Sequence, residues 1–222
     1  MLSAAGDIII LFDVDNTLLD NDTFGAELSH RLEGAFGKDE CERYWRIFHD
    51  SRSQLGVADY LGSLQLFRAG HEHDPQLLHL SEFMLEYPFA DRVYPQALAA
   101  VEHLASFGAT AVLSDGDVVF QPRKIRRSGI WYAVGGRVMV CLHKEQSLDV
   151  MQQRYPASRY LMIDDKPGLL AAMKRRMGAR LTTFFVRQGH YAHEPDALSH
   201  DPPPDRIVER IGDLTSLTSA EL

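Results

Sequence analysis

Basic residues are the minority in this chain, which has 23 Lys+Arg against 31 Asp+Glu and a formal net charge of −8. A broad nucleic-acid-binding face needs clustered positive charge, so this balance argues against nucleic acid as a partner. Cysteine is also scarce: the chain has only Cys41 and Cys141, far apart and in no Cys-x-x-Cys pattern. Two such thiols favour a reducing compartment and argue against a disulfide-stabilised scaffold.

Long hydrophobic runs are missing as well. No stretch approaches the ~18–20 apolar residues that a membrane span needs. The start "MLSAAGDIIILF" lacks the basic residues and the long apolar segment of a signal peptide. We therefore expect a soluble, cytoplasmic protein with no membrane partner. The 222 residues suffice for one large domain, or for a core domain with a smaller inserted one. The sequence does not indicate an oligomeric state.

Short apolar runs alternate with helical patterns along most of the chain. Such runs, without regular polar positions, are typical of strands buried on both faces of a parallel sheet. Strands that alternate with helices predict a Rossmann-like α/β fold, a parallel sheet with helices on both faces. The expected strands are residues 7–12, 109–114, 159–164 and 180–186, the expected helices are 94–108, 144–155 and 167–178, and 206–217 reads as a last short strand or helix.

Residues 20–90 break this alternation, because they contain no strand pattern. Gly, Asp and Pro signals divide the segment into four amphipathic helical patterns. An all-helical piece inserted after the first strand should form its own small bundle, hinged near residues 19–22 and 86–95. We therefore expect two domains: an α/β core domain from residues 1–19 and 91–222, and a helical domain from residues 20–90.

Polar side chains stand at the expected strand ends. In an open parallel sheet, ligands bind outside the carboxyl ends of the strands. Side chains two positions apart in an extended chain point the same way. The sequence therefore predicts that carboxylates, a hydroxyl and an ammonium group gather at one edge of the sheet. These residues are Asp13 and Asp15 after the first strand, Ser114 after the second, Asp164 and Asp165 after the third, and Lys144 at the start of the helix that leads into the third strand.

The stretch "DVDNTLLDND" (13–22) packs four aspartates closely together. Carboxylates this close repel one another, so a fold keeps them together only when a positive group lies among them. A small number of hard carboxylate oxygens suits Mg²⁺, which binds one or two carboxylates and a phosphate oxygen and keeps several waters. We expect Mg²⁺ as the cofactor.

Four segments resemble the motifs of the haloacid dehalogenase (HAD) superfamily. "DVDNTL", "VLSDG", Lys144 and "IDD" follow one another in the order of that family. The resemblance covers residues 8 to about 186, and the helical insertion is similar to the C1 cap of the family. It implies a Mg²⁺-dependent phosphohydrolase of small phosphorylated metabolites. The cap of such an enzyme closes over the site and sets the specificity.

The resemblance also implies roles for the acidic residues. Asp13 would be the nucleophile that forms an aspartyl-phosphate, and Asp15 the general acid and base. Thr17 would hydrogen-bond near Asp15 and support the turn. Asp13, the main-chain carbonyl of Asp15 and the pair Asp164–Asp165 would surround the metal. We favour Asp165 as the direct ligand, because the commoner Gly-Asp form of this motif aligns its aspartate with the second position.

Phosphate binding is implied for the second and third motifs. Ser114 and the amides of Asp115 and Gly116 would hold phosphoryl oxygens, and Lys144 would stabilise the charge on the transferring group. Family members often have proline after this lysine, whereas this chain has glutamate. Lys124 is a rival for the role of Lys144, but it stands in the basic run "RKIRR", which we expect to face water.

Asp15 argues against the dehalogenase branch of the family, whose chemistry needs no leaving-group acid at that position. Two alternatives to a phosphatase stay open. One is a phosphotransferase such as a phosphosugar mutase, and the other is a HAD-fold binding or regulatory protein without turnover. Arg52 and Asp59 in the cap are candidate substrate-reading residues.

Overall fold

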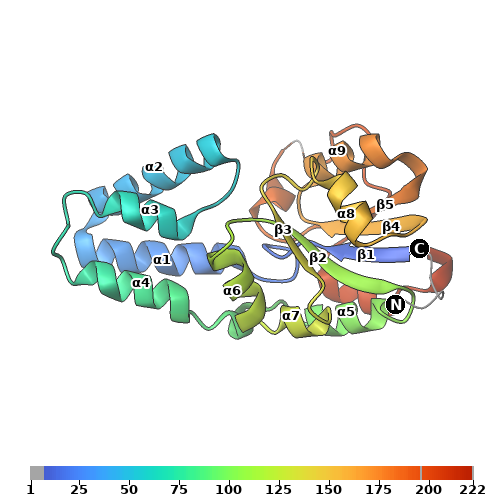
Figure 1. Ribbon diagram of the computed structural model, residues 1–222, viewed down its shortest axis with the longest axis horizontal. Coiled ribbons are helices and arrows are strands. Elements are labelled where there is room, and N and C mark those ends of the chain that lie inside the picture. The colour runs from blue at the N-terminus through green and yellow to red at the C-terminus, as the bar shows by residue number, and fades with distance from the viewer. Residues whose placement is uncertain (1–7, 196, 222) are drawn as a thin grey trace.

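The computed structural model describes residues 8–195 and 197–221. Within these residues a six-stranded sheet has the spatial order β3-β2-β1-β4-β5-β6, and each neighbouring pair is parallel (Figure 1). This confirms the predicted α/β fold, although Asp7 of the first expected strand lies outside the described residues. The strands are β1 (Ile8–Phe12), β2 (Ala109–Asp115), β3 (Val138–Cys141), β4 (Arg159–Asp164), β5 (Leu181–Val186) and β6 (Arg206–Val208).

Side chains of β1 alternate between two hydrophobic clusters, one on each face of the sheet. Ile10 and Phe12 pack with α5, α6 and α7, whereas Ile9 and Leu11 pack with α8 and α9. Because both faces are covered, every residue of β1 is buried, which explains its unbroken apolar sequence. These helices are α5 (Ala97–Leu104), α6 (Phe120–Arg127), α7 (Ile130–Ala133), α8 (Leu148–Arg154) and α9 (Pro167–Met177).

Three details differ from the sequence-based expectation. The four-residue strand β3 was not expected, because "VMVC" is short and follows two glycines. The segment 206–217 contains both a strand, β6, and a 3₁₀ helix (Ile211–Ser216), where the pattern offered one or the other. Helix α8 begins only at Leu148, so Lys144 lies in the turn before the helix and not at its start.

The chain between β1 and α5 is helical, as its pattern predicts. The Asp20 carboxylate caps the first of these helices by accepting the Thr23 N–H at 2.9 Å, and Asp59 caps the third by accepting the Gly62 N–H at 2.7 Å. None of the helices in residues 8–195 and 197–221 combines the length and apolar character that crossing a bilayer requires. The helices are α1 (Asn21–Phe36), α2 (Lys38–Leu55), α3 (Tyr60–Phe67) and α4 (Gln76–Glu86).

The two segments that join these helices to the sheet pair with each other. Leu19 forms an antiparallel bridge with Val93, and the Asp20 N–H donates to the Arg92 carbonyl at 2.8 Å. The pairing brings the start and the end of the helical insertion together at the edge of the sheet. The division of the chain into two domains at these segments stays a prediction.

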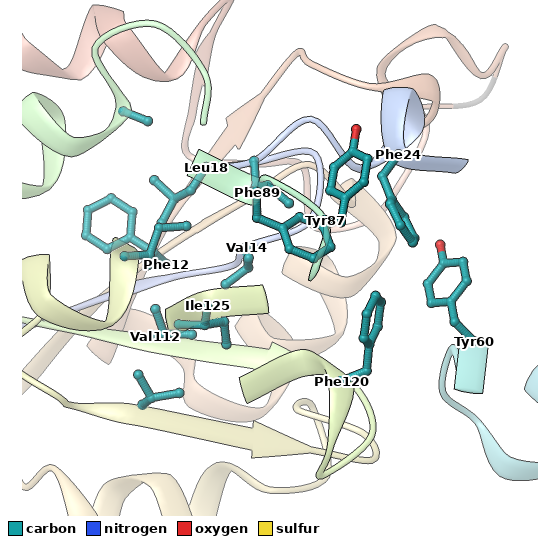
Figure 2. Packing of buried hydrophobic residues seen from close by; sticks show 14 of the residues in the cluster. Phe12, Val14, Leu18, Phe24, Tyr60, Tyr87, Phe89, Val112, Phe120 and Ile125 are labelled. Atoms are coloured by element: carbon teal, nitrogen blue, oxygen red, sulfur yellow. The ribbon is translucent and has the colours of Figure 1, made fainter. Parts of the chain in front are cut away.

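An aromatic cluster links α6 to the inserted helices (Figure 2). The ring of Phe120, the first residue of α6, lies 5.6 Å from Phe24 of α1 and 5.6 Å from Tyr60 of α3, measured between centroids. Phe89 lies 5.8 Å from Phe120 and completes the contact. All four rings are buried. Helix α6 is therefore fixed beside the insertion, and its next turn, which carries Lys124, lies against the end of β1.

Candidate active site

The carboxyl ends of β1, β2 and β4 bring the predicted motif residues together. Phe12 pairs with Ile163, and the Asp13 N–H donates to the Ile163 carbonyl at 2.9 Å, which continues the β1–β4 ladder by one residue. Asp13, Asp164 and Ser114 consequently lie at the same edge of the sheet. From β1 the chain continues to β2 and β3 on one side of β1, and then returns to β4 on the other side. The carboxyl end of β1 is therefore a topological switch point, where open α/β sheets bind ligands.

Lys144 lies at the centre of the carboxylate cluster. Its ammonium group donates to Asp13 at 2.5 Å and to Asp164 at 2.7 Å. Burial opposes the charge on Lys144, but the carboxylates of Asp13, Asp164 and Asp115 outweigh it and raise the pKa of the lysine. Lys144 is therefore a permanent cation beside the predicted nucleophile.

Asp165 is the carboxylate without a partner. The two oxygens of Asp164 accept hydrogen bonds from the Lys144 ammonium and from the Lys166 N–H at 2.9 Å. Both oxygens of Asp165 are buried, and neither has a hydrogen-bond partner among the described residues. Burial raises the pKa of Asp165 well above its ordinary value. An ionised carboxylate that is buried without donors is unfavourable, and both oxygens of this side chain are available to a cation.

The unpartnered oxygens of Asp165 and the carboxylates beside it fit a divalent metal. Asp13, Asp164 and Asp165 each offer a carboxylate oxygen, and the three atoms lie within 4.8 Å of one another. Hard oxygen ligands in this number suit Mg²⁺. Both oxygens of Asp164 already accept hydrogen bonds from Lys144 and Lys166, whereas those of Asp165 accept none among the described residues, so of this pair Asp165 has the greater coordination capacity left. The choice of Asp165 over Asp164 as direct ligand stays a prediction.

Replacing Asp165 with Asn is expected to abolish a rise in melting temperature caused by Mg²⁺ without lowering the melting temperature of the metal-free protein. Asn removes both a metal ligand and a buried, unpaired carboxylate. Thermal unfolding with Mg²⁺ and with chelator measures both effects. The exposed Asp50→Asn variant is the matched control and should keep the full response to Mg²⁺. An Asp165→Asn variant that keeps that response contradicts the assignment.

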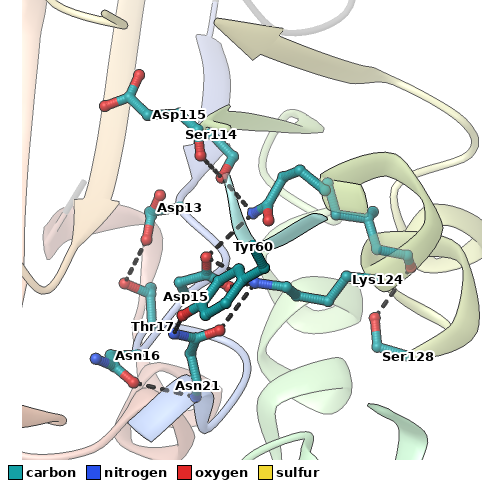
Figure 3. Close-up of polar contacts among 12 residues, drawn as sticks. Asp13, Asp15, Asn16, Thr17, Asn21, Tyr60, Ser114, Asp115, Lys124 and Ser128 are labelled. Carbon is teal, nitrogen blue, oxygen red and sulfur yellow. Dashed lines mark hydrogen bonds and ion pairs between the residues drawn. The ribbon is translucent and has the colours of Figure 1, made fainter. Parts of the chain in front are cut away.

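Asp15 is bonded to α6 and not to the cluster around Lys144. The Lys124 ammonium donates to both Asp15 oxygens, at 2.7 and 2.9 Å, and Gln121 adds a bond at 3.3 Å (Figure 3). Lys124 also donates to the Asn21 side-chain oxygen at 2.9 Å, and the Asn21 amide donates to the Tyr60 hydroxyl at 3.2 Å. The carboxylate of Asp15 is thus linked through two side chains to a residue of α3.

The expectation that the run 123–127 faces water is wrong for Lys124, which is completely buried. Phe120, Lys124 and Ile125 lie on one face of α6, and all three are buried. The helical spacing of these residues was a signal that Lys124 shares the inward face. The two lysines differ in position, since Lys144 contacts Asp13 and Lys124 contacts Asp15, and the role of Lys144 in charge stabilisation stays a prediction.

Thr17 and Ser114 lie in the site with different partners from those expected. The Thr17 hydroxyl donates to Asp13 at 3.4 Å, whereas we expected Thr17 to form its hydrogen bond near Asp15. The tight turn after β1 curls the chain back, so the hydroxyl returns to the first aspartate. The Ser114 hydroxyl accepts from the Gln121 amide at 3.0 Å. Gln121, which the sequence analysis did not single out, therefore contacts both Ser114 and Asp15.

Gly116 does not offer its amide to a phosphate. The Gly116 N–H donates to the Cys141 carbonyl at 3.0 Å, because the unexpected strand β3 extends the sheet beside it. The glycine is required by a close approach, since a Cβ here would lie 2.7 Å from the Cβ of Gln121. The Asp115 carboxylate accepts the main-chain N–H of Lys144 at 2.7 Å and so holds the lysine turn in place.

Asp115 should give stability a measurable pH dependence. Burial raises its pKa to about 6, whereas an unfolded aspartate titrates at about 3.9. The folded protein therefore holds this proton more tightly, and the group contributes stability that is present below about pH 4 and lost as the pH rises through about 6. Asp115→Asn should gain stability relative to wild type between these pH values. Urea unfolding of both proteins across this range measures it, and parallel curves contradict it.

Several residues without a predicted role line a cavity of about 400 Å³ beside Asp15. They include Lys166, His190 and Tyr191, which follow β4 and β5. Arg52, which we expected as a candidate substrate-reading residue of the cap, also lines this cavity. Asp59, the other candidate, lies outside it and caps α3.

The chain is similar to a known protein family and to solved structures. A family model for haloacid dehalogenase-like hydrolases matches residues 9–175. A solved structure described as a haloacid dehalogenase-like hydrolase from Burkholderia xenovorans LB400 is 55% identical, with a TM-score of 0.90, over 96% of this chain and 100% of that chain. No match was found among curated proteins.

More distant structures share the fold. The L-2-haloacid dehalogenase from Xanthobacter autotrophicus is 15% identical over 93% of this chain and 96% of its own, with a TM-score of 0.62. A HAD-hydrolase from Bacillus subtilis bound to magnesium has the same identity, coverage and TM-score. At this identity the likeness concerns the fold alone.

Proposed function

Because the chain belongs to the haloacid dehalogenase-like hydrolases, we propose that it is a Mg²⁺-dependent phosphohydrolase of small phosphorylated metabolites. Membership of the family establishes a hydrolase fold and motif set. The reaction, the metal and the substrate class are inferred from the residues of the site.

The presence of Asp15 carries this proposal. An alkoxide leaves a phosphate ester only with a proton donor at its oxygen, whereas a halide leaves as a stable anion. Asp15 follows Asp13 by two residues, lines the cavity, and keeps 23% of its side chain exposed. Lys124 and Gln121 hold its carboxylate in one place. A site for dehalogenation has no use for such a group.

In the first half-reaction, a carboxylate oxygen of Asp13 attacks phosphorus and the bond from phosphorus to the leaving oxygen breaks. Asp15 gives its proton to that oxygen, so the product leaves as an alcohol. The Lys144 ammonium, bonded to Asp13, lies where negative charge builds up on the transferring group. The Ser114 hydroxyl, held by Gln121, is a donor for a phosphoryl oxygen.

In the second half-reaction, water attacks the phosphorus of the aspartyl-phosphate and the bond to the Asp13 oxygen breaks. Asp15 takes the proton of that water and thereby returns to the form that can act as an acid again. Inorganic phosphate and free Asp13 are the products.

Asp13, Asp165 and the main-chain carbonyl of Asp15 are the groups that would hold Mg²⁺. The ion would neutralise the charge of the phosphate and the attacking carboxylate. Asp164, with both oxygens bonded to lysine residues, would orient Lys144 and the chain around the metal.

Release of phosphate and of halide, measured side by side, tests the proposal. The substrates are a panel of phosphorylated metabolites and a panel of 2-haloacids, each with Mg²⁺ and with chelator. We expect Mg²⁺-dependent phosphate release and no halide. Halide release without phosphate release contradicts the proposal. Phosphate transfer to an added sugar phosphate supports the phosphotransferase alternative, and a folded protein without any turnover supports the binding alternative.

A further inference from the structure

The cavity beside Asp15 has one wall from the inserted helices and one from the sheet. Residues of α1, α2 and α3 form the first wall, and residues after β1, β4 and β5 form the second. Under the proposed function Asp15 protonates the leaving oxygen, so the remainder of the leaving group must occupy this cavity. The side chains that line it therefore determine which phosphate esters fit.

Helix α2 presents an aromatic wall that ends in a positive charge. Trp45, Phe48 and Arg52 are spaced by three and four residues and so share one face of the helix. The Phe48 ring lies 5.2 Å from Trp45 and 4.6 Å from Tyr60, between centroids. The wall is apolar along these rings, and the guanidinium of Arg52 lies one turn further on.

Arg52 is bonded to a hydroxyl group and not to a carboxylate. Its guanidinium donates to the neutral Tyr191 hydroxyl at 2.8 Å and has no carboxylate at ion-pair distance in the described part of the chain. The acidic residues of the same cavity have other partners. Asp15 pairs with Lys124 at 2.7 Å, and the Asp22 carboxylate contacts the His190 ring at 2.7 Å. Arg52 thus offers a positive charge to whatever enters the cavity.

Lys166, another cationic side chain that lines the cavity, belongs to the wall formed by the sheet, because it follows β4 directly after Asp164 and Asp165. Its ammonium lies 5.2 Å from the centroid of the Tyr191 ring, whose hydroxyl bonds Arg52. Arg52 is therefore the cation of the cavity wall formed by α2, and Lys166 lies on the wall formed by the sheet.

We infer that the substrate is the phosphate monoester of a small hydroxy acid, whose carboxylate binds Arg52 while its carbon atoms lie against Phe48 and Tyr60. This inference rests on the proposed function, because it assigns the cavity to the leaving group. A carboxylate matches the guanidinium of Arg52 in charge and in hydrogen-bonding geometry.

Binding of two phosphonates tests the inference. Phosphonoacetate and ethylphosphonate have similar size, and only the first carries a carboxylate. In the presence of Mg²⁺, the wild type should bind phosphonoacetate about 10-fold more tightly, the ratio typical of a charged hydrogen-bonded pair. In Arg52→Gln the ratio of the two affinities should fall close to one. Arg46→Gln, an exposed arginine of α2 outside the cavity, is the matched control and should keep the wild-type ratio.

Equal affinities in the wild type, or a ratio that survives in Arg52→Gln, overturn the inference. An equal loss of both affinities in Arg52→Gln also overturns it, because Arg52 then contacts the phosphoryl group. If both phosphonates bind equally while phosphate esters are hydrolysed, the proposed function stands without the carboxylate. If neither phosphonate binds, the phosphate site itself is contradicted, and the inference with it.

Discussion

Replacing Asp13 with Asn is expected to lower phosphate release by at least about 10³-fold, because the amide oxygen is a poor nucleophile and the aspartyl-phosphate cannot form. The substitution also removes the negative partner that Lys144 contacts at 2.5 Å. Asn keeps the shape of the side chain, so the loss should appear in kcat. Steady-state phosphate release with saturating Mg²⁺ measures it.

The control for this experiment is Asp50→Asn, which changes an exposed aspartate of α2 and should keep wild-type activity. Melting temperatures of the variants show whether the fold is intact. An Asp13→Asn protein that keeps a tenth of the wild-type rate would mean that another group attacks phosphorus.

Replacing Lys124 with Met is expected to lower the rate about 10²-fold for alkyl phosphates and much less for p-nitrophenyl phosphate. Lys124 positions the Asp15 carboxylate through both of its oxygens, at 2.7 and 2.9 Å. An alkoxide needs the proton that Asp15 delivers, whereas nitrophenolate leaves without it. The ratio of the two rates therefore separates a positioning role from a loss of structure, which would lower both rates alike.

Two further variants sharpen this result. Arg126→Met removes an exposed positive charge from the same helix and should leave the ratio unchanged. The double variant of Lys124→Met with Asp15→Asn should be no worse than Asp15→Asn alone, because the lysine acts through the carboxylate. Fully additive losses would show that Lys124 acts on the reaction by a different route.

The sheet and the position of Asp13 at its edge could be predicted because their signals are local in the sequence. Apolar runs such as Ile8–Phe12 fill both faces of a parallel sheet, and the residues just past the strand ends lie at the switch point. The short strand β3 was missed because four residues after two glycines carry too little pattern. Its presence occupies the Gly116 amide, which the motif alone had assigned to phosphate.

The partners of Asp15 could not be read from the sequence. Lys124 stands among arginines in a run whose composition predicts a solvated helix face, and only the packing of Phe120 against the inserted helices turns it inward. The bond from Arg52 to Tyr191 joins residues 139 positions apart, from α2 and from the segment after β5. Contacts between distant segments depend on how the insertion lies over the sheet, which no local pattern encodes.

The different hydrogen bonding of Asp164 and Asp165 could not be predicted from the sequence either. The two residues are adjacent and chemically identical, so the sequence offered only an analogy for choosing between them. The structure separates them by their donors: Asp164 accepts from Lys144 and Lys166, and Asp165 accepts from none of the described residues.

The most direct test of an aspartyl-phosphate at Asp13 is mass spectrometry of the protein, quenched in acid during turnover of a phosphate ester with Mg²⁺. We expect a mass increase of one phosphoryl group on the peptide that contains Asp13. The increase should be present in the wild type and absent from Asp13→Asn. Phosphate release at the full rate with no labelled peptide, or with the label on another residue, would contradict an aspartyl-phosphate at Asp13.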